Sequence, residues 1–86
     1  MTDYVITFAR SAEKELAALP ITVVLRARLA IDALAVNPRP SGCKKLRNAR
    51  GRWRVRVGDY RVVYTINDKQ RLVDIETVRH RRFVYR

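Results

Sequence analysis

The stretch that decides the fold is Arg52-Trp-Arg-Val-Arg-Val-Gly-Asp-Tyr-Arg-Val-Val-Tyr64. On both sides of Gly58-Asp59 the side chains alternate with a period of two, which is typical of strands buried on one face. Two turn residues between such runs predict a β-hairpin. Because a two-residue loop fixes the register, Val57 is expected to face Tyr60, and every further pair follows from that one.

This register sorts the hairpin side chains onto two faces. The first face is apolar or aromatic and carries Trp53, Val55, Val57, Tyr60, Val62 and Tyr64. The second face groups four arginines: Arg52, Arg54, Arg56 and Arg61. Like charges opposed across a sheet, as Arg56 and Arg61 would be, are destabilising unless an anion lies between them. If the next turn spans four residues, Glu76 falls opposite Arg61 and neutralises part of this charge. The planar guanidinium still favours a phosphate-binding surface over a merely solvated one.

The segments before the hairpin predict a strand followed by two helices. Residues 3–8 alternate as a strand does. Ser11 is expected to cap a helix that ends at Pro20, and apolar residues at helical spacing continue in a second helix through residue 36. The prolines and the glycine of Asn37-Pro-Arg-Pro-Ser-Gly42 interrupt any regular element. Two amphipathic helices with so short a connection form a helical hairpin.

Two further strands are expected around the β-hairpin. Residues 43–46 predict a short edge strand, and residues 71–79 predict a strand after a turn at 67–70. The expected fold class is α+β in the order β-α-α-β-β-β(-β), with the helical hairpin packed on one face of a curved antiparallel sheet. A length of 86 residues accommodates this fold as a single domain, residues 1–86.

The charge of the chain is unevenly distributed. Nineteen lysines and arginines outnumber eight aspartates and glutamates, which gives a formal net charge of +11. Residues 1–38 contain four basic and four acidic side chains, so the whole excess belongs to residues 39–86. A neutral scaffold joined to a concentrated basic half favours an anionic partner, most commonly nucleic acid.

Several classes of protein are not indicated. No apolar run reaches the roughly 18 residues that a membrane span needs. The start lacks the basic and apolar regions of a signal peptide, so we expect a cytoplasmic protein without membrane contact. The single cysteine, Cys43, allows neither an internal disulfide nor a thiolate zinc site. No motif indicates a metal site, a phosphate-binding glycine loop or a nucleophile triad.

The C-terminal run Val78-Arg-His-Arg-Arg-Phe-Val-Tyr-Arg86 contains candidates for proton transfer and base stacking. His80 is the only histidine, and its ordinary pKa of about 6.5 suits proton transfer near neutral pH. Tyr85 can stack on a base of single-stranded RNA. The alternative is that His80 is structural and that Phe83 and Tyr85 pack the tail against the domain.

Three motifs in order resemble the RelE group of the RelE/ParE toxin superfamily. They are Asn37-Pro-Arg-Pro-x-Gly-x-Lys-Lys-Leu46, the hairpin from Trp53 to Tyr64, and Val78-x-His-Arg-Arg-x-Val-Tyr-Arg86. The resemblance covers nearly all of the chain. It implies a helical hairpin on a curved antiparallel sheet, and the toxin of a toxin–antitoxin pair.

The activity that this resemblance implies is an endoribonuclease that enters the ribosomal A site and cuts the exposed mRNA codon. The ribose 2′-hydroxyl would attack the adjacent phosphate and leave a 2′,3′-cyclic phosphate and a 5′-hydroxyl. No metal or other cofactor is implied, because the nucleophile belongs to the substrate. The implied partners are the ribosome, mRNA and a cognate antitoxin that neutralises the toxin and represses their operon with it.

The resemblance also implies roles for individual residues. Arg61 is expected to contact the scissile phosphate, Arg81 to act as acid or charge stabiliser, and Tyr85 to stack on the base and align the 2′-hydroxyl. Arg54 and Arg56 match the two basic residues of the central strand. Further contacts to RNA are expected from Lys44, Lys45, Arg52 and Arg82.

One departure from the family pattern concerns the general base. Well-studied relatives have lysine at the positions of Arg54 and Arg56, and lysine is their candidate base. Arginine stays protonated in proteins. His80 therefore becomes the candidate base in this chain.

Two rival functions share the expected fold or the basic composition. A ParE-like toxin has the same fold but inhibits DNA gyrase through a protein–protein contact. Its members usually lack a concentrated arginine face and the His-Arg-Arg-x-Val-Tyr ending. A nucleic-acid-binding module without catalytic activity would need only the basic half of the chain.

Overall fold

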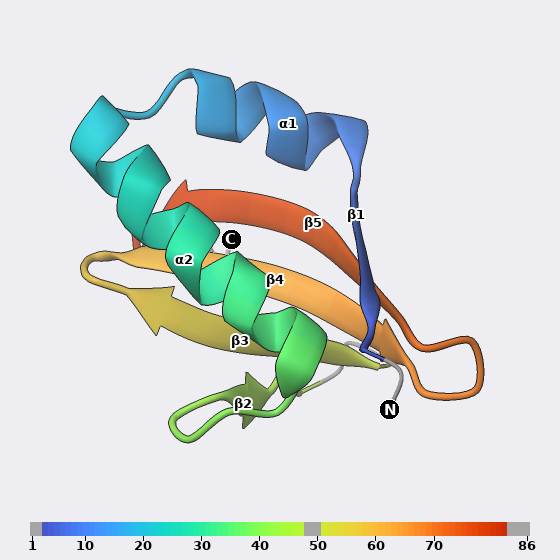
Figure 1. Ribbon diagram of the computed structural model, residues 1–86. Helices are drawn as coiled ribbons and strands as arrows, with labels where there is room; N and C mark the ends of the chain where they lie inside the picture. The colour runs from blue at the N-terminus through green and yellow to red at the C-terminus, as the bar shows by residue number, and fades with distance from the viewer. Residues whose placement is uncertain (1–2, 48–50, 83–86) are drawn as a thin grey trace.

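Two helices pack on one side of a five-stranded sheet in the computed structural model, which describes residues 3–47 and 51–82 (Figure 1). The elements in chain order are β1 (Val5–Phe8), α1 (Arg10–Ala17), α2 (Ile21–Val36), β2 (Lys44–Lys45), β3 (Arg52–Val57), β4 (Tyr60–Asn67) and β5 (Leu72–His80). The strands lie in the order β1-β5-β4-β3-β2. Helix α2 crosses the sheet and α1 lies beside β5. The α+β class and the helical hairpin are confirmed.

The first strand makes the sheet mixed. Strands β2, β3, β4 and β5 pair antiparallel in turn, whereas β1 runs parallel to β5, with Val5 opposite Leu72. The expectation of a wholly antiparallel sheet is corrected in this respect. Parallel strands need a long crossover connection, and here the helical hairpin and the three intervening strands provide it.

The central β-hairpin has the predicted register. Arg52 faces Thr65, Arg56 faces Arg61 and Val57 faces Tyr60. Gly58 adopts a φ of 60°, a left-handed conformation that glycine accepts without steric cost at the first position of a hairpin turn.

The pairing of β4 with β5 contains a β-bulge that the sequence pattern did not indicate. Val63 pairs with Thr77, but the next residue, Tyr64, pairs with Ile75. Glu76 is therefore the extra residue of the bulge, left without a direct cross-strand partner.

The bulge and the turn together overturn the expected position of Glu76. Asn67 pairs with Leu72, so the four-residue turn spans 68–71, one position later than expected. With the extra residue of the bulge, Arg79 rather than Glu76 faces Arg61. The predicted neutralisation of Arg61 by an opposed glutamate is therefore wrong.

The hydrophobic core lies between the helices and the apolar face of the hairpin. It consists of Ala12, Leu16, Ala27, Ile31, Leu34, Val57, Val62, Tyr64, Val73, Ile75 and Val78. Burying each of the larger aliphatic side chains contributes about 1.5–3 kcal/mol. Tyr64 is fully buried, and its hydroxyl donates a hydrogen bond of 2.8 Å to the Pro38 carbonyl. Burial raises the pKa of Tyr64.

The start of α1 differs from the prediction. Its N-cap is Ala9, which makes no side-chain capping bond, and Ser11 instead donates a 2.8 Å hydrogen bond to the carbonyl of Glu76. Glu15 accepts a 3.0 Å bond from the backbone N–H of Val78. Strand β1 covers only residues 72–75 of β5, so the backbone groups beyond need other partners. The side chains of α1 supply them.

Candidate functional site

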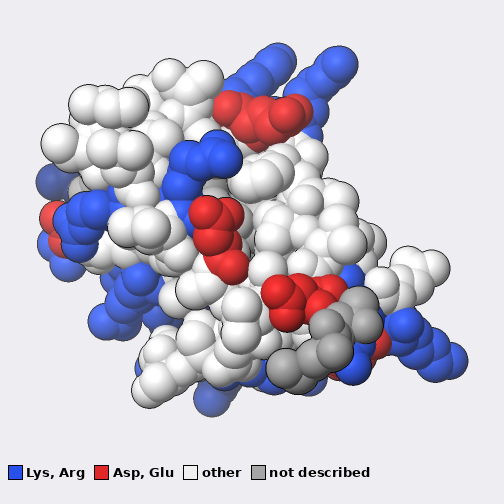
Figure 2. All heavy atoms as spheres, viewed as in Figure 1, with Lys and Arg blue, Asp and Glu red and all other residues white. Residues whose placement is uncertain are grey.

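The two faces of the sheet differ in charge. On the helix side, uncharged side chains cover most of the visible surface, while many lysine and arginine side chains project at its margin (Figure 2). Strand register places a basic set on the opposite side, hereafter the arginine face. Its members are Lys44, Arg52, Arg54, Arg56, Arg61 and Arg79.

Three members of the arginine face form a row across three strands. Arg56 faces Arg61, and Arg61 faces Arg79. The Cβ atoms of opposed residues lie about 4.5–5.5 Å apart, so these charges repel one another. Glu15 forms an ion pair with Arg79 and offsets one of the three charges.

Arg61 occupies a fixed, buried position at the centre of this row. The residue is 8% exposed, and its Nη1 donates to the backbone carbonyls of Gly58 and Tyr60 at 3.4 and 3.2 Å. These two backbone carbonyls help to fix the orientation of the guanidinium. A donor held in this way can bind an anion with little reorganisation.

Arg54 is buried even more deeply. It is 5% exposed, and within residues 3–47 and 51–82 neither its Nε nor its Nη1 has a hydrogen-bond partner. Burying a charged group without partners costs several kcal/mol, and native structures rarely leave such donors unsatisfied. The Nε and Nη1 groups of Arg54 are therefore available to donate hydrogen bonds to an anion.

A pocket of about 360 Å³ opens beside Arg54. Its lining residues are Ser41, Gly42, Lys44, Arg54, Val55 and Arg56. Gly42 has a φ of 89° in a turn closed by a 3.1 Å bond from the N–H of Cys43 to the Pro40 carbonyl. This turn geometry favours glycine. Among the described residues, the lining combines three cations and a hydroxyl with no carboxylate, so it suits an oxyanion such as phosphate.

Acidic side chains offset the positive charge at the other end of the arginine face. Arg52 donates through Nε to Glu76 at 2.7 Å, and the Asp74 carboxylate, which accepts a 2.7 Å hydrogen bond from Thr7, lies on the same strand. Positive charge on this face is therefore concentrated at the end that carries Arg54 and the pocket.

His80 lies on the opposite side of the sheet from the arginine face. It faces Tyr60 across β4 and β5, and the two rings meet edge to face with centroids 5.4 Å apart. Its Nδ1 accepts a 3.3 Å hydrogen bond from the backbone N–H of Arg82. The structure therefore does not bring His80 together with Arg61.

The residues after β5 lie near the hairpin turn. The backbone N–H of Arg81 donates to the Asp59 carbonyl at 2.8 Å, and the side chains of Arg81 and Arg82 are exposed. The predicted stacking residue, Tyr85, lies outside the described residues.

The two predicted lysines diverge. Lys44 faces Arg54 and belongs to the arginine face, whereas Lys45 faces Trp53 and belongs to the helix side. Only Lys44 of this pair lines the pocket.

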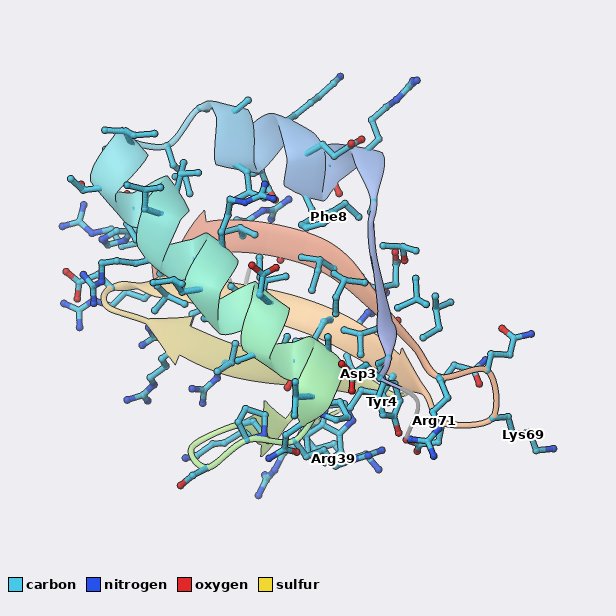
Figure 3. All side chains as sticks on the ribbon, viewed as in Figure 1. Asp3, Tyr4, Phe8, Arg39, Lys69 and Arg71 are labelled. Atoms are coloured by element: carbon cyan, nitrogen blue, oxygen red, sulfur yellow. The ribbon has the colours of Figure 1, made fainter. Side chains whose placement is uncertain are left out.

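A second charged cluster, hereafter the Asp68 cluster, joins Tyr4, Arg39, Trp53, Asp68 and Arg71 near the β4–β5 turn. Figure 3 labels three of these residues, Tyr4, Arg39 and Arg71. Arg39 donates to both carboxylate oxygens of Asp68 at 3.3 and 2.9 Å, and it lies 5.1 Å from the Trp53 ring centroid. Tyr4 donates to Asp68 at 2.5 Å, and Arg71 lies over the Tyr4 ring. The hydrogen bond from Arg39 lowers the pKa of Asp68. No local sequence signal links these distant positions.

The arginine face offers fixed positive charge and N–H donors for a phosphate group that gains negative charge during reaction. In the part of the chain that the structure describes, no three His, Cys, Asp or Glu side chains are grouped to hold a metal ion. Neither of the two described helices is long and apolar enough to cross a membrane.

Comparisons with a family model and with solved structures point to the same superfamily of proteins. The family model of the ParE toxin of type II toxin-antitoxin system, parDE, matches residues 6–85. Comparison with curated proteins gave no match.

Solved structures of RelE toxins resemble the chain over most of its length. The archaeal RelE–RelB complex from Pyrococcus horikoshii OT3 has a chain that is 30% identical, with a TM-score of 0.81 over 94% of this chain and 97% of that one. The toxin–antitoxin complex RelBE2 from Mycobacterium tuberculosis gives 30% identity and a TM-score of 0.80, with 93% of each chain covered. The isolated E. coli RelE toxin gives 25% identity and 0.78, covering 90% of this chain and 83% of that one. The chain belongs to the RelE/ParE superfamily of type II toxins.

Proposed function

We propose that this toxin is a ribosome-dependent endoribonuclease that cleaves mRNA in the A site and thereby inhibits translation in the cytoplasm. The observation that carries the proposal is the arginine face, where the buried Arg54 guanidinium lies beside a pocket whose described lining residues include no carboxylate. Such a face suits the phosphates of RNA. In the reaction, the 2′-hydroxyl loses its proton and attacks the adjacent phosphorus. The 5′-oxygen leaves and takes up a proton, giving a 2′,3′-cyclic phosphate and a 5′-hydroxyl.

The arginines act by position and charge. Arg61 holds the scissile phosphate, because backbone carbonyls already fix its guanidinium. Arg54 and Arg56 stabilise the charge that develops on the phosphate oxygens. Arg81 serves as acid or charge stabiliser for the leaving oxygen, and Tyr85 stacks on the base.

Removal of the 2′ proton needs an acceptor that arginine cannot provide. His80 is the proposed acceptor. Its Nδ1 is engaged by the N–H of Arg82 at 3.3 Å, so His80 accepts a proton there only when this long bond opens. Because His80 lies on the other side of the sheet from Arg61, this role also requires the substrate to reach the end of β5.

A protein partner is supported by the outer surface of α2. Four large apolar side chains on this helix are 57–73% exposed: Ile21, Leu25, Leu29 and Val36. Exposed apolar surface of this kind is typical of protein-binding sites. Relatives have been crystallised as toxin–antitoxin complexes with RelB. We propose that a cognate antitoxin neutralises the toxin and represses their shared operon together with it.

The decisive experiment is inducible expression with and without the adjacent reading frame, followed by mapping of transcript ends. Wild-type protein should arrest growth and produce cuts within codons of translated messages only. Arg61→Ala should remain folded, because the residue lies outside the core, and should lower the cleavage rate about 10²–10³-fold. Arg10→Ala removes an exposed arginine of α1 and is the matched control. Undiminished toxicity of soluble Arg61→Ala would contradict the site.

The second candidate is inhibition of DNA gyrase, and the match to the ParE model favours it. The same induction separates the two functions. DNA damage without cuts in translated codons would support gyrase inhibition. The absence of both effects would point to a nucleic-acid-binding module without catalytic activity.

A further inference from the structure

Helix α2 is apolar on its outer face as well as on its inner face. The inner face packs into the core through three buried residues: Ala27, Ile31 and Leu34. The outer face carries four large apolar side chains that are 57–73% exposed, hereafter the outer stripe: Ile21, Leu25, Leu29 and Val36. A helix that is apolar on all sides is typical of a position buried on all sides. The outer stripe therefore indicates a surface that is covered in an assembly.

The spacing of the outer stripe is symmetric about Leu29. Leu25 and the small, exposed Ala33 lie four positions to either side. Ile21 lies eight positions before Leu29, and Val36 lies seven positions after it. Two copies related by a two-fold axis contact each other reciprocally, so that residue i meets residue j and j meets i. An antiparallel pair centred on Leu29 places Leu29 against its own copy and Leu25 against Ala33. Ile21 then meets Val36.

One base and one acid flank the outer stripe. Arg28 and Asp32 are exposed one helical turn apart, and neither forms an ion pair within residues 3–47 and 51–82. Arg28 lines a pocket with Glu13 and Leu16, so this flank of α2 faces α1. A two-fold axis that runs across both helices sets this flank against the same flank of the second copy.

The antiparallel pair brings these opposite charges together twice. With Leu29 at the centre, Arg28 of one copy and Asp32 of the other differ in level by two residues. At a rise of about 1.5 Å per residue, this offset is about 3 Å, which an arginine side chain can span. The outer stripe and its flank are therefore complementary to a second copy of themselves in both shape and charge.

The net charge of +11 does not oppose this contact at the surface concerned. Residues 1–38 contain as many acidic as basic side chains, and the whole excess belongs to residues 39–86. The arginine face lies on the other side of the sheet from the helices. Two copies joined through α2 therefore point their arginine faces away from each other, and salt screens charges that are farther apart than about 8 Å.

We propose that the toxin, when free of antitoxin, forms a two-fold homodimer in which the outer stripes pack antiparallel about Leu29. The arginine faces stay open to solvent in this dimer. A second copy and an antitoxin compete for the outer stripe, so each excludes the other. Neither the dimer nor its test depends on ribonuclease activity, so failure of one proposal leaves the other intact.

Sedimentation velocity over a range of protein concentrations tests the dimer. Wild type should shift reversibly from the mass of one chain to the mass of two as its concentration rises. Leu29→Glu places two carboxylates at the two-fold axis and should weaken dimerisation at least about tenfold, because the centre of an interface contributes most to affinity. Val5→Glu is the matched control. It adds the same charge at an apolar side chain that is 60% exposed on β1, and dimerisation should be unchanged.

Charge reversal tests the antiparallel register. Arg28→Glu and Asp32→Arg should each weaken dimerisation about tenfold, because each sets like charges against one another. The double variant restores the opposite charges and should regain the wild-type dissociation constant. The single variants change the net charge in opposite directions, so a general effect of charge cannot weaken both. All these side chains are exposed, and circular dichroism should show an unchanged fold.

Three results would overturn the inference. The first is a wild-type protein that stays monomeric at every concentration, which would leave the outer stripe to the antitoxin alone. The second is a dimer that Leu29→Glu does not weaken, which would place the interface elsewhere. The third is a double variant that dimerises no better than the single ones, which would exclude the antiparallel pairing of Arg28 with Asp32.

Discussion

The Asp68 cluster and the arginine face both contain arginines, but these arginines differ in burial and in their hydrogen-bond partners. In the Asp68 cluster, the side chain of Arg39 is 41% exposed, yet it has a two-point contact with a carboxylate and an aromatic ring beneath it. On the arginine face, Arg54 is 5% exposed and two of its nitrogens lack any partner within the described segments. Arg39, which is exposed, has hydrogen-bond acceptors for its guanidinium, whereas two buried nitrogens of Arg54 have none among the described residues.

The difference does not come from a shortage of acids near the arginine face. Asp74 and Glu76 lie on neighbouring β5, but they bind Thr7 and Arg52 at the far end of the face. The Asp68 cluster joins the N-terminal segment, the loop after α2 and the β4–β5 turn, so its ion pair serves the fold. Among the described residues, the Arg54 guanidinium makes no such link. Its buried Nε and Nη1, without partners there, fit the proposed role of Arg54 in binding a phosphate.

The largest expected effect comes from removing the unsatisfied charge. Arg54→Met should lower the rate of mRNA cleavage on translating ribosomes about 10²–10³-fold, because it removes a donor to the reacting RNA. The same change should raise the free energy of unfolding by about 1–3 kcal/mol, since buried donors without partners disappear. Cleavage assays and urea denaturation measure the two quantities.

A matched substitution separates this effect from a general loss of charge. Arg10→Met should change neither the cleavage rate nor stability by a comparable amount, because Arg10 is exposed on α1. A fall in the stability of Arg54→Met would mean that the guanidinium is already compensated in the free protein, and the contrast with Arg39 would fail.

A smaller effect should follow from giving Arg54 the kind of partner that Arg39 has. Val63 is 6% exposed and faces Arg54 directly across β3 and β4. Val63→Glu should therefore be more stable than Val63→Gln by about 1.5–3 kcal/mol, the contribution of a hydrogen bond to a charged group. Both variants have nearly the same shape, so the difference isolates the carboxylate.

Val63→Glu should also lose sensitivity to phosphate, because its carboxylate occupies the donors of Arg54. Denaturation with and without phosphate measures this loss. Equal stability of the two variants would contradict the observation that the Nε and Nη1 atoms of Arg54 lack partners among the described residues.

How far these features could be predicted from sequence depends on the range of the interactions. The hairpin register was predictable because the turn at Gly58 and the alternation beside it are local. The arginine face follows from that register. The core stripes of the two helices were predictable for the same reason, since helical spacing alone determines them.

Features set by long-range contacts were not predictable. The alternation of apolar and polar residues in β5 does not reveal the bulge at Glu76. The bulge nevertheless changes which residue faces Arg61. Ser11 makes a bond 65 positions away instead of capping its helix. The side of the sheet on which His80 lies depends on the turn and the bulge together. The pocket beside Arg54 also depends on Ser41 and Gly42, which come from a different segment of the chain.

The smallest expected effect concerns the ion pair of Arg39 with Asp68, and this effect on stability depends on pH. Hydrogen bonds from Arg39 and Tyr4 lower the pKa of Asp68 in the folded protein. A carboxyl group whose pKa is lower when folded contributes stability above its unfolded pKa of about 3.9, and this contribution is lost as pH falls through the folded value. Asp68→Asn should therefore be slightly less stable than wild type at pH 7, and the difference should shrink below about pH 4.

Urea denaturation of both proteins between pH 7 and pH 3 measures that difference, and Asp32→Asn on exposed α2 controls for the loss of one negative charge. Because the Asp68 cluster lies on the surface, water screens its ion pair and limits what it contributes. Phosphate should stabilise Asp68→Asn as much as wild type, since the cluster is separate from the pocket. Arg54→Met should abolish stabilisation by phosphate. If Asp68→Asn abolished it as well, Arg39 and Arg54 would be energetically coupled. The two arginines could then no longer be treated as belonging to separate sites.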